Sequence, residues 1–474
     1  MKKFIDIIKK KWLIDTTKTF ILVAILVVAF IGINLGVQKL NLTGIDVTKE
    51  KLYSLTDESK QKIKDIDQDV TIYFFGVEEN TSTVDLAKQY SKVNAKIKTE
   101  VIDVNDRPDL AEKYGVEDGD TGIVVQASER NKILSVQDLS TYDYSTGETL
   151  DVTEQKLTNA LIDTTISKKP KIYFLTGHQE PLSKLQTLQV YLTNEVNELD
   201  VLNLLTTEFP TDCDCLVISN PTSDFTEYEA NSIIDYINNG GKILWLNDSP
   251  TSDYPNIQKV LDVFGVSLDR GIVRETNSTK MVRNESSYIV PDISYHSITE
   301  HIITDGEVLL FASTKINFAD DNKLDELGAT VTPLLKSSST SFFRTDATIT
   351  SSSSSDSEES GPFTLGAEVT KTLDNNKESK LIIYSNNKFA TDSVTIGQQS
   401  YSAIGLSSNM DLLLNSVAYL TDRGDSITIR KNIGSITYTP TEQEDTVIRI
   451  IIFAIPVLII LVGLIVWQIR RRKK

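Results

Sequence analysis

Residues 177–180 (Gly-His-Gln-Glu) are the stretch whose residue types and spacing could support catalysis. They follow a run of β-forming residues, 172–175, so they would lie in a loop at the carboxyl end of a buried strand, where α/β sheets usually bind ligands. His178 could act as a general base and Glu180 could orient it. No Gly-x-Ser-x-Gly or Gly-x-Cys-x-Gly motif supplies a nucleophile. Two interpretations stay open: a hydrolase or amidase site, or polar residues that tie down the strand end.

The other chemically capable residues form no complete site. His296 and His301 are five residues apart, not the four that would turn two histidines toward one metal on a helix. Cys213 and Cys215, the only cysteines, are too close in sequence for an unstrained disulfide and are expected to be free thiols. No Walker phosphate-binding motif occurs, because residues 240–242 (Gly-Gly-Lys) lack the upstream glycine and the downstream hydroxyl. The sequence therefore predicts no catalytic residues, no metal and no cofactor.

The elements that would position residues 177–180 alternate between strand and helix. Buried strands are expected at 171–175, 215–221 and 242–246, with a helix-like segment after the first and a helix over 225–239 after the second. This order predicts a parallel sheet with right-handed crossovers. The 225–239 helix would have Thr226 as its N-cap and one apolar face made of Tyr228, Ile233, Ile234 and Ile237.

Residues 68–140 predict a second, smaller α/β unit. Its order is strand, helix, strand, helix, strand, strand, with a short helix over 58–66 before it, capped by Thr56 or Asp57. The last two strands would pair as a hairpin-like unit. The order is that of a thioredoxin-like domain, but no Cys-x-x-Cys follows the first strand, so no redox activity is expected. A connecting helix would follow over 151–169, with Leu157, Ala160 and Leu161 inward.

Two segments are long and apolar enough to cross a membrane as helices, Thr19–Gln38 and Ile450–Ile469. A signal peptide is the alternative for the first, but a long charged region precedes it and no cleavage site follows before Lys39. Positive charge lies outside both segments, at the two chain ends. The positive-inside bias then predicts a cell-membrane protein with both termini cytoplasmic and an extracytoplasmic middle.

Charge limits the range of partners. Residues 1–18 carry +4 and residues 470–474 carry +5, so the formal charge of −18 becomes −27 for residues 19–469. Such an acidic surface disfavours nucleic acid, whose recognition requires clustered Lys and Arg. The expected partners are therefore the lipid bilayer and proteins. An exported chain without a disulfide framework suggests a bacterial surface.

The domain organisation follows from these segments. We expect a cytoplasmic N-terminus (1–18), a transmembrane helix (19–38), a thioredoxin-like domain with a membrane-proximal segment (39–150), a larger α/β domain (151–446), a second transmembrane helix (447–469) and a basic cytoplasmic tail (470–474). Residues 337–360, dominated by Ser and Thr, are expected to form a solvent-exposed loop of the larger domain. Tyr53 and Leu55 would pack either on the protein's own domains or on a partner.

Several segments, taken in order, resemble one known family. Residues 46–56 (DVTKEKLYSLT) and 70–75 are similar to the opening of GldG-like auxiliary subunits of ABC-2-type transporters. The later segments 172–181 (IYFLTGHQEP), 216–221 (LVISNP), 236–246 and 264–273 agree, as does the terminal span before RRRKK. The resemblance implies that the larger domain has a class I glutamine amidotransferase-like fold without its catalytic cysteine. Here Ser219 and Asn220 occupy the corresponding turn.

The resemblance also implies a function. It predicts a non-enzymatic, membrane-anchored accessory subunit that presents its ectodomain to a separate ABC transporter permease and ATPase. The alternative from another class is a cell-surface hydrolase or amidase that uses His178 and Glu180.

Overall fold

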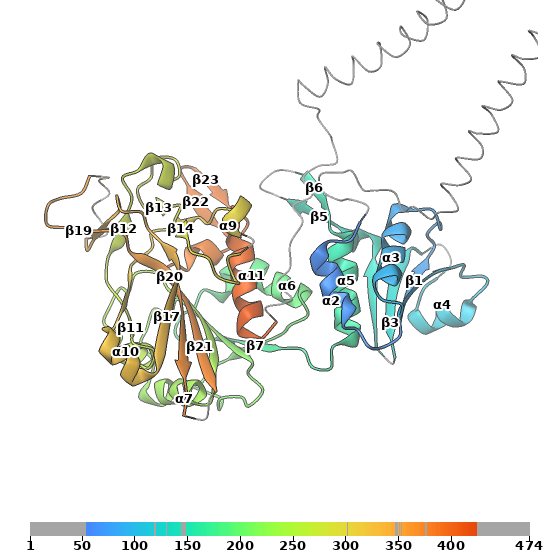
Figure 1. Ribbon diagram of the computed structural model, residues 1–474, viewed down its shortest axis with the longest axis horizontal. Coiled ribbons are helices and arrows are strands. Elements are labelled where there is room, and N and C mark those ends of the chain that lie inside the picture. Colours follow the sequence, from blue (N-terminus) through green and yellow to red (C-terminus); the bar gives the residue numbers. More distant parts are fainter. Residues whose placement is uncertain are drawn as a thin grey trace, which may run out of the picture. The chain divides into compact units, whose positions relative to one another are not determined.

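A computed structural model describes residues 54–423, except for 118–119, 129, 144–147, 301, 347–348, 350, 352 and 375–376. The molecule is a mixed α/β protein with several sheets (Figure 1). Within the described part of the chain, no helix combines the length and apolar character needed to cross a bilayer. The two expected spans, 19–38 and 450–469, lie outside the described residues, as does Tyr53.

The N-terminal part is built on a four-stranded sheet with the order β2-β1-β3-β4. Its central strand β1 pairs parallel to β2 and antiparallel to β3, and β3 pairs antiparallel to β4. The expected order of strands and helices and the expected hairpin are confirmed. The strands are β1 (Val70–Phe75), β2 (Ile97–Ile102), β3 (Gly122–Ala127) and β4 (Arg130–Ser135), and the helices between them are α3 (Ser82–Val93) and α4 (Pro108–Tyr114).

Two further helices flank this sheet in sequence. Helix α2 (Asp57–Lys64) begins at Thr56, whose side chain accepts the Ser59 N–H at 3.1 Å, so the expected cap is confirmed. Helix α5 (Thr153–Thr165) buries its three expected residues, Leu157, Ala160 and Leu161. Leu55 is 2% exposed, which favours packing on the protein itself over display to a partner. Between β4 and α5 lie a 3-10 turn (Val136–Leu139), β5 (Ser140–Asp143) and β6 (Glu148–Asp151).

The larger sheet has ten strands, five of them parallel. The parallel strands lie in the order β8-β7-β9-β10-β21, and an antiparallel extension continues beyond β21. The parallel part comprises β7 (Lys171–Leu175), β8 (Glu198–Leu202), β9 (Cys215–Ser219), β10 (Lys242–Leu246) and β21 (Glu378–Tyr384). The extension comprises β20 (Thr364–Thr372), β17 (Ala329–Lys336), β16 (Ile316–Phe318), β11 (Val266–Leu268) and β14 (Asp292–Ile293).

The sequence pattern missed β8. This strand lies between the expected strands β7 and β9 in sequence and forms an edge of the sheet. Glu198 and Asp200 alternate along it, a polar pattern that is typical of an edge strand facing water. Strand order reverses at β7, since the chain runs from β7 outward to β8 and then returns to β9 on the other side. In open α/β sheets, ligands bind outside the carboxyl ends of the strands at such a reversal.

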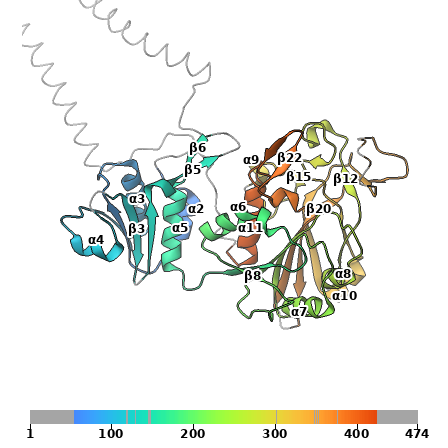
Figure 2. The same ribbon diagram turned by 180° about the vertical axis from the view of Figure 1, so that it is seen from behind.

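Helices cover both faces of the parallel strands (Figures 1 and 2). On one face, Ile172 and Phe174 of β7 pack in one core with residues of α6 (Gln186–Asn194) and α11 (Asn409–Leu420). On the other face, Tyr173 and Leu175 belong to a second core with residues of α7 (Glu227–Asn238) and α8 (Pro255–Asp262). The two-residue alternation of a strand therefore divides β7 between two cores.

One expected helix face is partly wrong. Thr226 caps α7 as expected, but Tyr228 is 58% exposed, whereas Ile233 and Ile237 are fully buried. At 3.6 residues per turn, five positions correspond to about 140° around the axis, which takes Tyr228 off the face of Ile233. Ala230 and Glu229 complete the buried face instead.

The expectation of an exposed loop over 337–360 is also wrong at both ends. Ser337 and Ser341 are buried, and the segment contains two strands, β18 (Phe342–Arg344) and β19 (Glu359–Ser360). They form a three-stranded sheet with β12 (Ile272–Arg274). The remaining short elements are β13 (Tyr288–Ile289) paired with β15 (Leu310–Phe311), β22 (Val394–Ile396) paired with β23 (Gln399–Tyr401), and the helices α9 (Ile302–Asp305) and α10 (Asp321–Leu327).

Candidate functional site

The loop after β7 turns His178 into the protein. Gly177 has φ 125° and Gln179 has φ 65°, so the residues on both sides of the histidine have positive φ, a conformation that favours glycine. A side chain at Gly177 would lie 3.3 Å from Leu205 Cδ1, which gives a second reason for glycine there. The loop is fixed to the segment after β9, because the Thr222 N–H donates to the His178 carbonyl at 2.9 Å. His178 is only 4% exposed.

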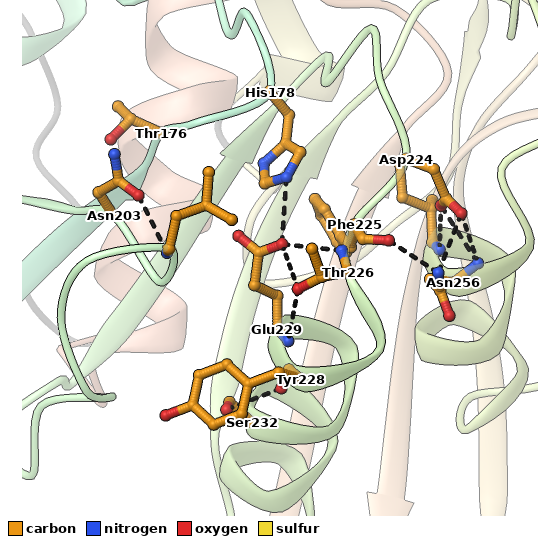
Figure 3. Close-up of polar contacts among 12 residues, drawn as sticks. Thr176, His178, Asn203, Asp224, Phe225, Thr226, Tyr228, Glu229, Ser232 and Asn256 are labelled. Atoms are coloured by element: carbon orange, nitrogen blue, oxygen red, sulfur yellow. Dashed lines mark hydrogen bonds and ion pairs between the residues drawn. The ribbon is translucent and has the colours of Figure 1, made fainter.

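Two carboxylates face the His178 ring. Nε2 lies 3.2 Å from Glu229 Oε2, and Nδ1 lies 3.5 Å from Glu180 Oε1 (Figure 3 shows the Glu229 contact). Both carboxylate side chains are about 1% exposed. Glu180 Oε2 also accepts the His178 backbone N–H at 2.8 Å, and the Phe225 ring meets the imidazole edge-on at 4.9 Å between centroids. The structure therefore brings together the two residues expected from the sequence and adds a third, Glu229.

Glu229 is held in place by the start of α7. Its Oε2 accepts both the Thr226 N–H at 2.8 Å and the Thr226 hydroxyl at 2.7 Å, and its own N–H donates back to Thr226 Oγ1 (Figure 3). This reciprocal capping box satisfies backbone donors that a helix start otherwise leaves unpaired. The Thr-x-x-Glu pattern at 226–229 is visible in the sequence, but it indicates only a helix start and not a partner for a histidine.

The Glu180 carboxylate, together with Glu229, raises the pKa of His178, although burial opposes this change. The hydrogen bonding within the cluster is incomplete. His178 Nδ1, Glu180 Oε1 and Glu229 Oε1 are buried without a hydrogen-bond partner among the described residues, so the 3.5 Å contact is an ion pair rather than an aligned hydrogen bond.

This geometry cross-links two elements. A general base needs a ring nitrogen that can reach a nucleophile or a substrate, but both nitrogens of His178 face buried carboxylates. The imidazole therefore connects the loop after β7 to the start of α7. Of the two interpretations of residues 177–180, the geometry favours the one in which polar residues tie down the strand end.

The other histidines are placed differently. His296 accepts the Ile298 N–H at Nδ1 (3.2 Å) and contacts Glu368 Oε2 through Nε2 (3.1 Å), so both ring nitrogens have partners. Tyr419 donates to the other Glu368 oxygen at 2.7 Å. His301 lies outside the described residues. Over the described ranges, no group of three or more His, Cys, Asp or Glu could hold a metal ion.

The cysteines are free, as expected. Burial raises the pKa of Cys213 to about 12 and also raises that of Cys215, which disfavours the reactive thiolate. Cys215 is fully buried. Because it begins β9, it lies at the opposite end of the strand from the loop that packs on His178.

The turn after β9 has an unusual backbone. Asn220 has φ 46°, in the left-handed region, and its Oδ1 accepts the Asp248 N–H at 3.1 Å. Ser219 before it is fully buried, and its hydroxyl donates to Asn387 Oδ1 at 2.6 Å. The turn therefore ties the end of β9 to the segments after β10 and β21.

Comparison with protein families gives one match over more than half of the chain. The model of a family described as an ABC-type uncharacterized transport system matches residues 169–416. The chain belongs to this family. The matched range contains His178, Glu180 and Glu229. Membership of this family indicates an accessory role in an ABC transport system, in agreement with the resemblance noted in the sequence. A second model, a domain of unknown function (DUF7088), matches residues 49–141.

Comparisons with individual proteins add only distant similarities. No curated protein matches this member of the ABC-type transport family. Among solved structures, the mmIFT52 N-terminal domain is 14% identical, with a TM-score of 0.39 over 53% of this chain and 97% of that one. The exo-beta-1,4-mannosidase Op5Man5 from Opitutaceae bacterium strain TAV5 is 10% identical, with a TM-score of 0.26 over 65% of this chain and 44% of that one.

Proposed function

We propose that the protein is a non-catalytic, membrane-anchored accessory subunit that presents an ectodomain to a separate ABC permease and ATPase. The family match over residues 169–416 carries this proposal. His178 is buried between two carboxylates, which supports the absence of catalysis at residues 177–180, the stretch whose residue types could have formed an active site. A hydrolase or amidase that uses His178 and Glu180 would first have to open this closed cluster.

The proposal includes a fold for each part of the ectodomain. The β2-β1-β3-β4 sheet order supports a thioredoxin-like domain without redox cysteines within residues 39–150. The parallel order β8-β7-β9-β10-β21 supports a class I glutamine amidotransferase-like domain within residues 151–446. Membrane anchoring through residues 19–38 and 447–469, with both termini in the cytoplasm, is proposed from the apolar segments and the terminal basic residues.

Co-purification tests the proposal. The full chain, tagged at its C-terminus and produced in its natural host, would be isolated from mildly solubilised membranes, and mass spectrometry would identify the proteins retained. We expect a multi-span permease and an ATPase with Walker motifs in stoichiometric amounts. An unrelated two-span protein with the same tag and abundance serves as the control. Recovery of neither subunit, or equal recovery with the control, would contradict the accessory role.

A further inference from the structure

A pocket with both polar and apolar lining residues lies at the carboxyl ends of the parallel strands. It has a volume of about 610 Å³ and adjoins a smaller pocket of about 220 Å³. Gln179 follows β7, Asn220 follows β9, Asp248 follows β10 and Lys388 follows β21, so four successive loops converge on it. This is the end of the sheet where strand order reverses, which is the usual ligand position in α/β proteins.

The pocket has an unusual charge for this molecule. Its charged lining residues are Lys184, Lys388 and Asp248, a net charge of +1 in a protein whose residues 19–469 carry −27. Both lysines are exposed, and among the described residues neither forms an ion pair. Two lysines that line one pocket can hold an acidic group such as a phosphate or a carboxylate.

Asp248 limits the acidic ligands that fit. It lines both pockets, and its Oδ1 accepts the Asn387 N–H at 2.7 Å. Burial raises its pKa, which Lys388 and Lys184 oppose. An anion that carries no hydrogen-bond donor would be repelled by the Asp248 carboxyl group. A ligand that places an ammonium group beside Asp248 and its acidic group between the lysines would instead pair every charge in the pocket.

The backbone around the pocket is strained. Gln179, Asn220 and Ala312 all line it, and all have positive φ, at 65°, 46° and 56°. Such conformations are unfavourable for residues with a side chain and persist where the surrounding structure enforces them, most often at binding sites. Here they direct three loops toward the same space.

We propose that this pocket binds a zwitterionic small molecule, with its acidic group between Lys184 and Lys388 and its ammonium group on Asp248. Tyr288 and Phe311, whose ring centroids lie 5.3 Å apart, also line the pocket. Free O-phosphoethanolamine and the phosphoethanolamine headgroup of a lipid share this chemistry. Binding does not depend on the accessory role in transport, so either could fail without the other.

Calorimetric titration of the full chain in a maltoside detergent tests the proposal. The probes are O-phosphoethanolamine, lysophosphatidylethanolamine, inorganic phosphate and ethanolamine. O-phosphoethanolamine should bind more tightly than either of its halves. Lys388→Ala should weaken it by about ten- to one-hundred-fold, the range for loss of one charged contact. The matched control is Lys323→Ala, a surface lysine of α10 that pairs with Glu326 and does not line this pocket, and this change should leave binding unaltered.

Asp248→Asn separates a zwitterion site from a simple anion site. This change should weaken the binding of O-phosphoethanolamine, because it removes the carboxylate that pairs with the ammonium group. It should strengthen the binding of inorganic phosphate, because it removes the repulsion between that carboxylate and the anion. Tighter binding of the lysolipid than of the free compound assigns the site to a headgroup, and the reverse assigns it to a soluble ligand. No heat from either zwitterion, or equal affinities in wild type and Lys388→Ala, overturns the proposal.

Discussion

At the scale of single residues, the buried imidazole of His178 is expected to contribute to stability through its charge. It lies between Glu180 and Glu229, whose side chains are each about 1% exposed, so a protonated His178 would place one positive charge between two buried carboxylates. Removing one member of such a group leaves an uncompensated charge in a region of low dielectric, which costs about 3–5 kcal/mol. The stability of the domain should therefore depend on the protonation of one histidine.

His178→Gln is expected to lower the free energy of unfolding by about 3 kcal/mol at pH 6 and by less at pH 9. The folded-state pKa of His178 is raised, so its contribution is fully present below the ordinary value of about 6.5 and is lost as the pH rises through the folded value. Denaturant unfolding of the full chain at both pH values would measure this difference.

Glu229→Gln is the companion variant. It keeps an oxygen for the contacts with Thr226 and removes one of the two charges that favour imidazolium, so its stability should fall less steeply between pH 6 and pH 9 than that of wild type. A His178→Gln deficit of the same size at both pH values would show that the ion pairs do not contribute.

At the scale of elements, Arg344 organises the segment that looks disordered in sequence. It ends β18, and its guanidinium donates to the carbonyls of Ser351 and Ser353 at 2.6 and 2.8 Å. It also pairs with Glu358 at 2.5 Å, and the side chains are 7% and 14% exposed. One buried cation therefore satisfies carbonyls along a stretch that has few apolar residues of its own.

Arg344→Met should destabilise the protein by about 3 kcal/mol at pH 7 and increase proteolytic cleavage between residues 345 and 358. The pair lowers the pKa of Glu358 to about 2, so its contribution is present above the ordinary value of about 4.3 and disappears as the pH falls through 2. Unfolding and limited proteolysis across this pH range would follow the difference.

Arg270→Met is the control, because Arg270 pairs with Asp253 at the surface, with 48% and 96% of the two side chains exposed. It should change stability by less than about 1 kcal/mol. If Arg344→Met resembled this control in both measurements, the loop would not depend on the guanidinium.

At the scale of the whole molecule, charge and hydropathy together predict topology. Each apolar segment has one basic residue on its inner side, Lys39 and Arg449, whereas the terminal sides carry the clusters of basic residues in 1–18 and 470–474, and residues 19–469 are strongly acidic. Under the positive-inside bias this pattern predicts that both ends lie in the cytoplasm. An ectodomain held at both ends would be confined near the outer loops of a permease.

Cysteine labelling of intact cells measures this topology. In a background with Cys213→Ser and Cys215→Ala, an impermeant maleimide should label Ser355→Cys, which is exposed, but neither Lys3→Cys nor Lys473→Cys. Both terminal cysteines should react after permeabilisation, which controls for their accessibility. Labelling of either terminus before permeabilisation would contradict the two-span arrangement.

The sequence by itself determined the features that depend on neighbours along the chain. The β-forming run before Gly177, the cap at Thr226 and the inward face of α5 were all predicted from local patterns and were confirmed. Parallel order was also predictable, since alternating strands and helices leave few other connections. The weak edge strand β8 was missed because its exposed side carries charges rather than an apolar pattern.

Only the tertiary structure decided which distant residues meet. It placed Glu229 against His178, brought the carbonyls of Ser351 and Ser353 to Arg344, and brought Lys388 into a pocket with Asn220. Each of these contacts joins loops or element ends whose local sequence permits many partners. Two cores pack on opposite faces of one sheet and fix the positions of the strand ends. The positions of the strand ends then determine which of these partners come into contact.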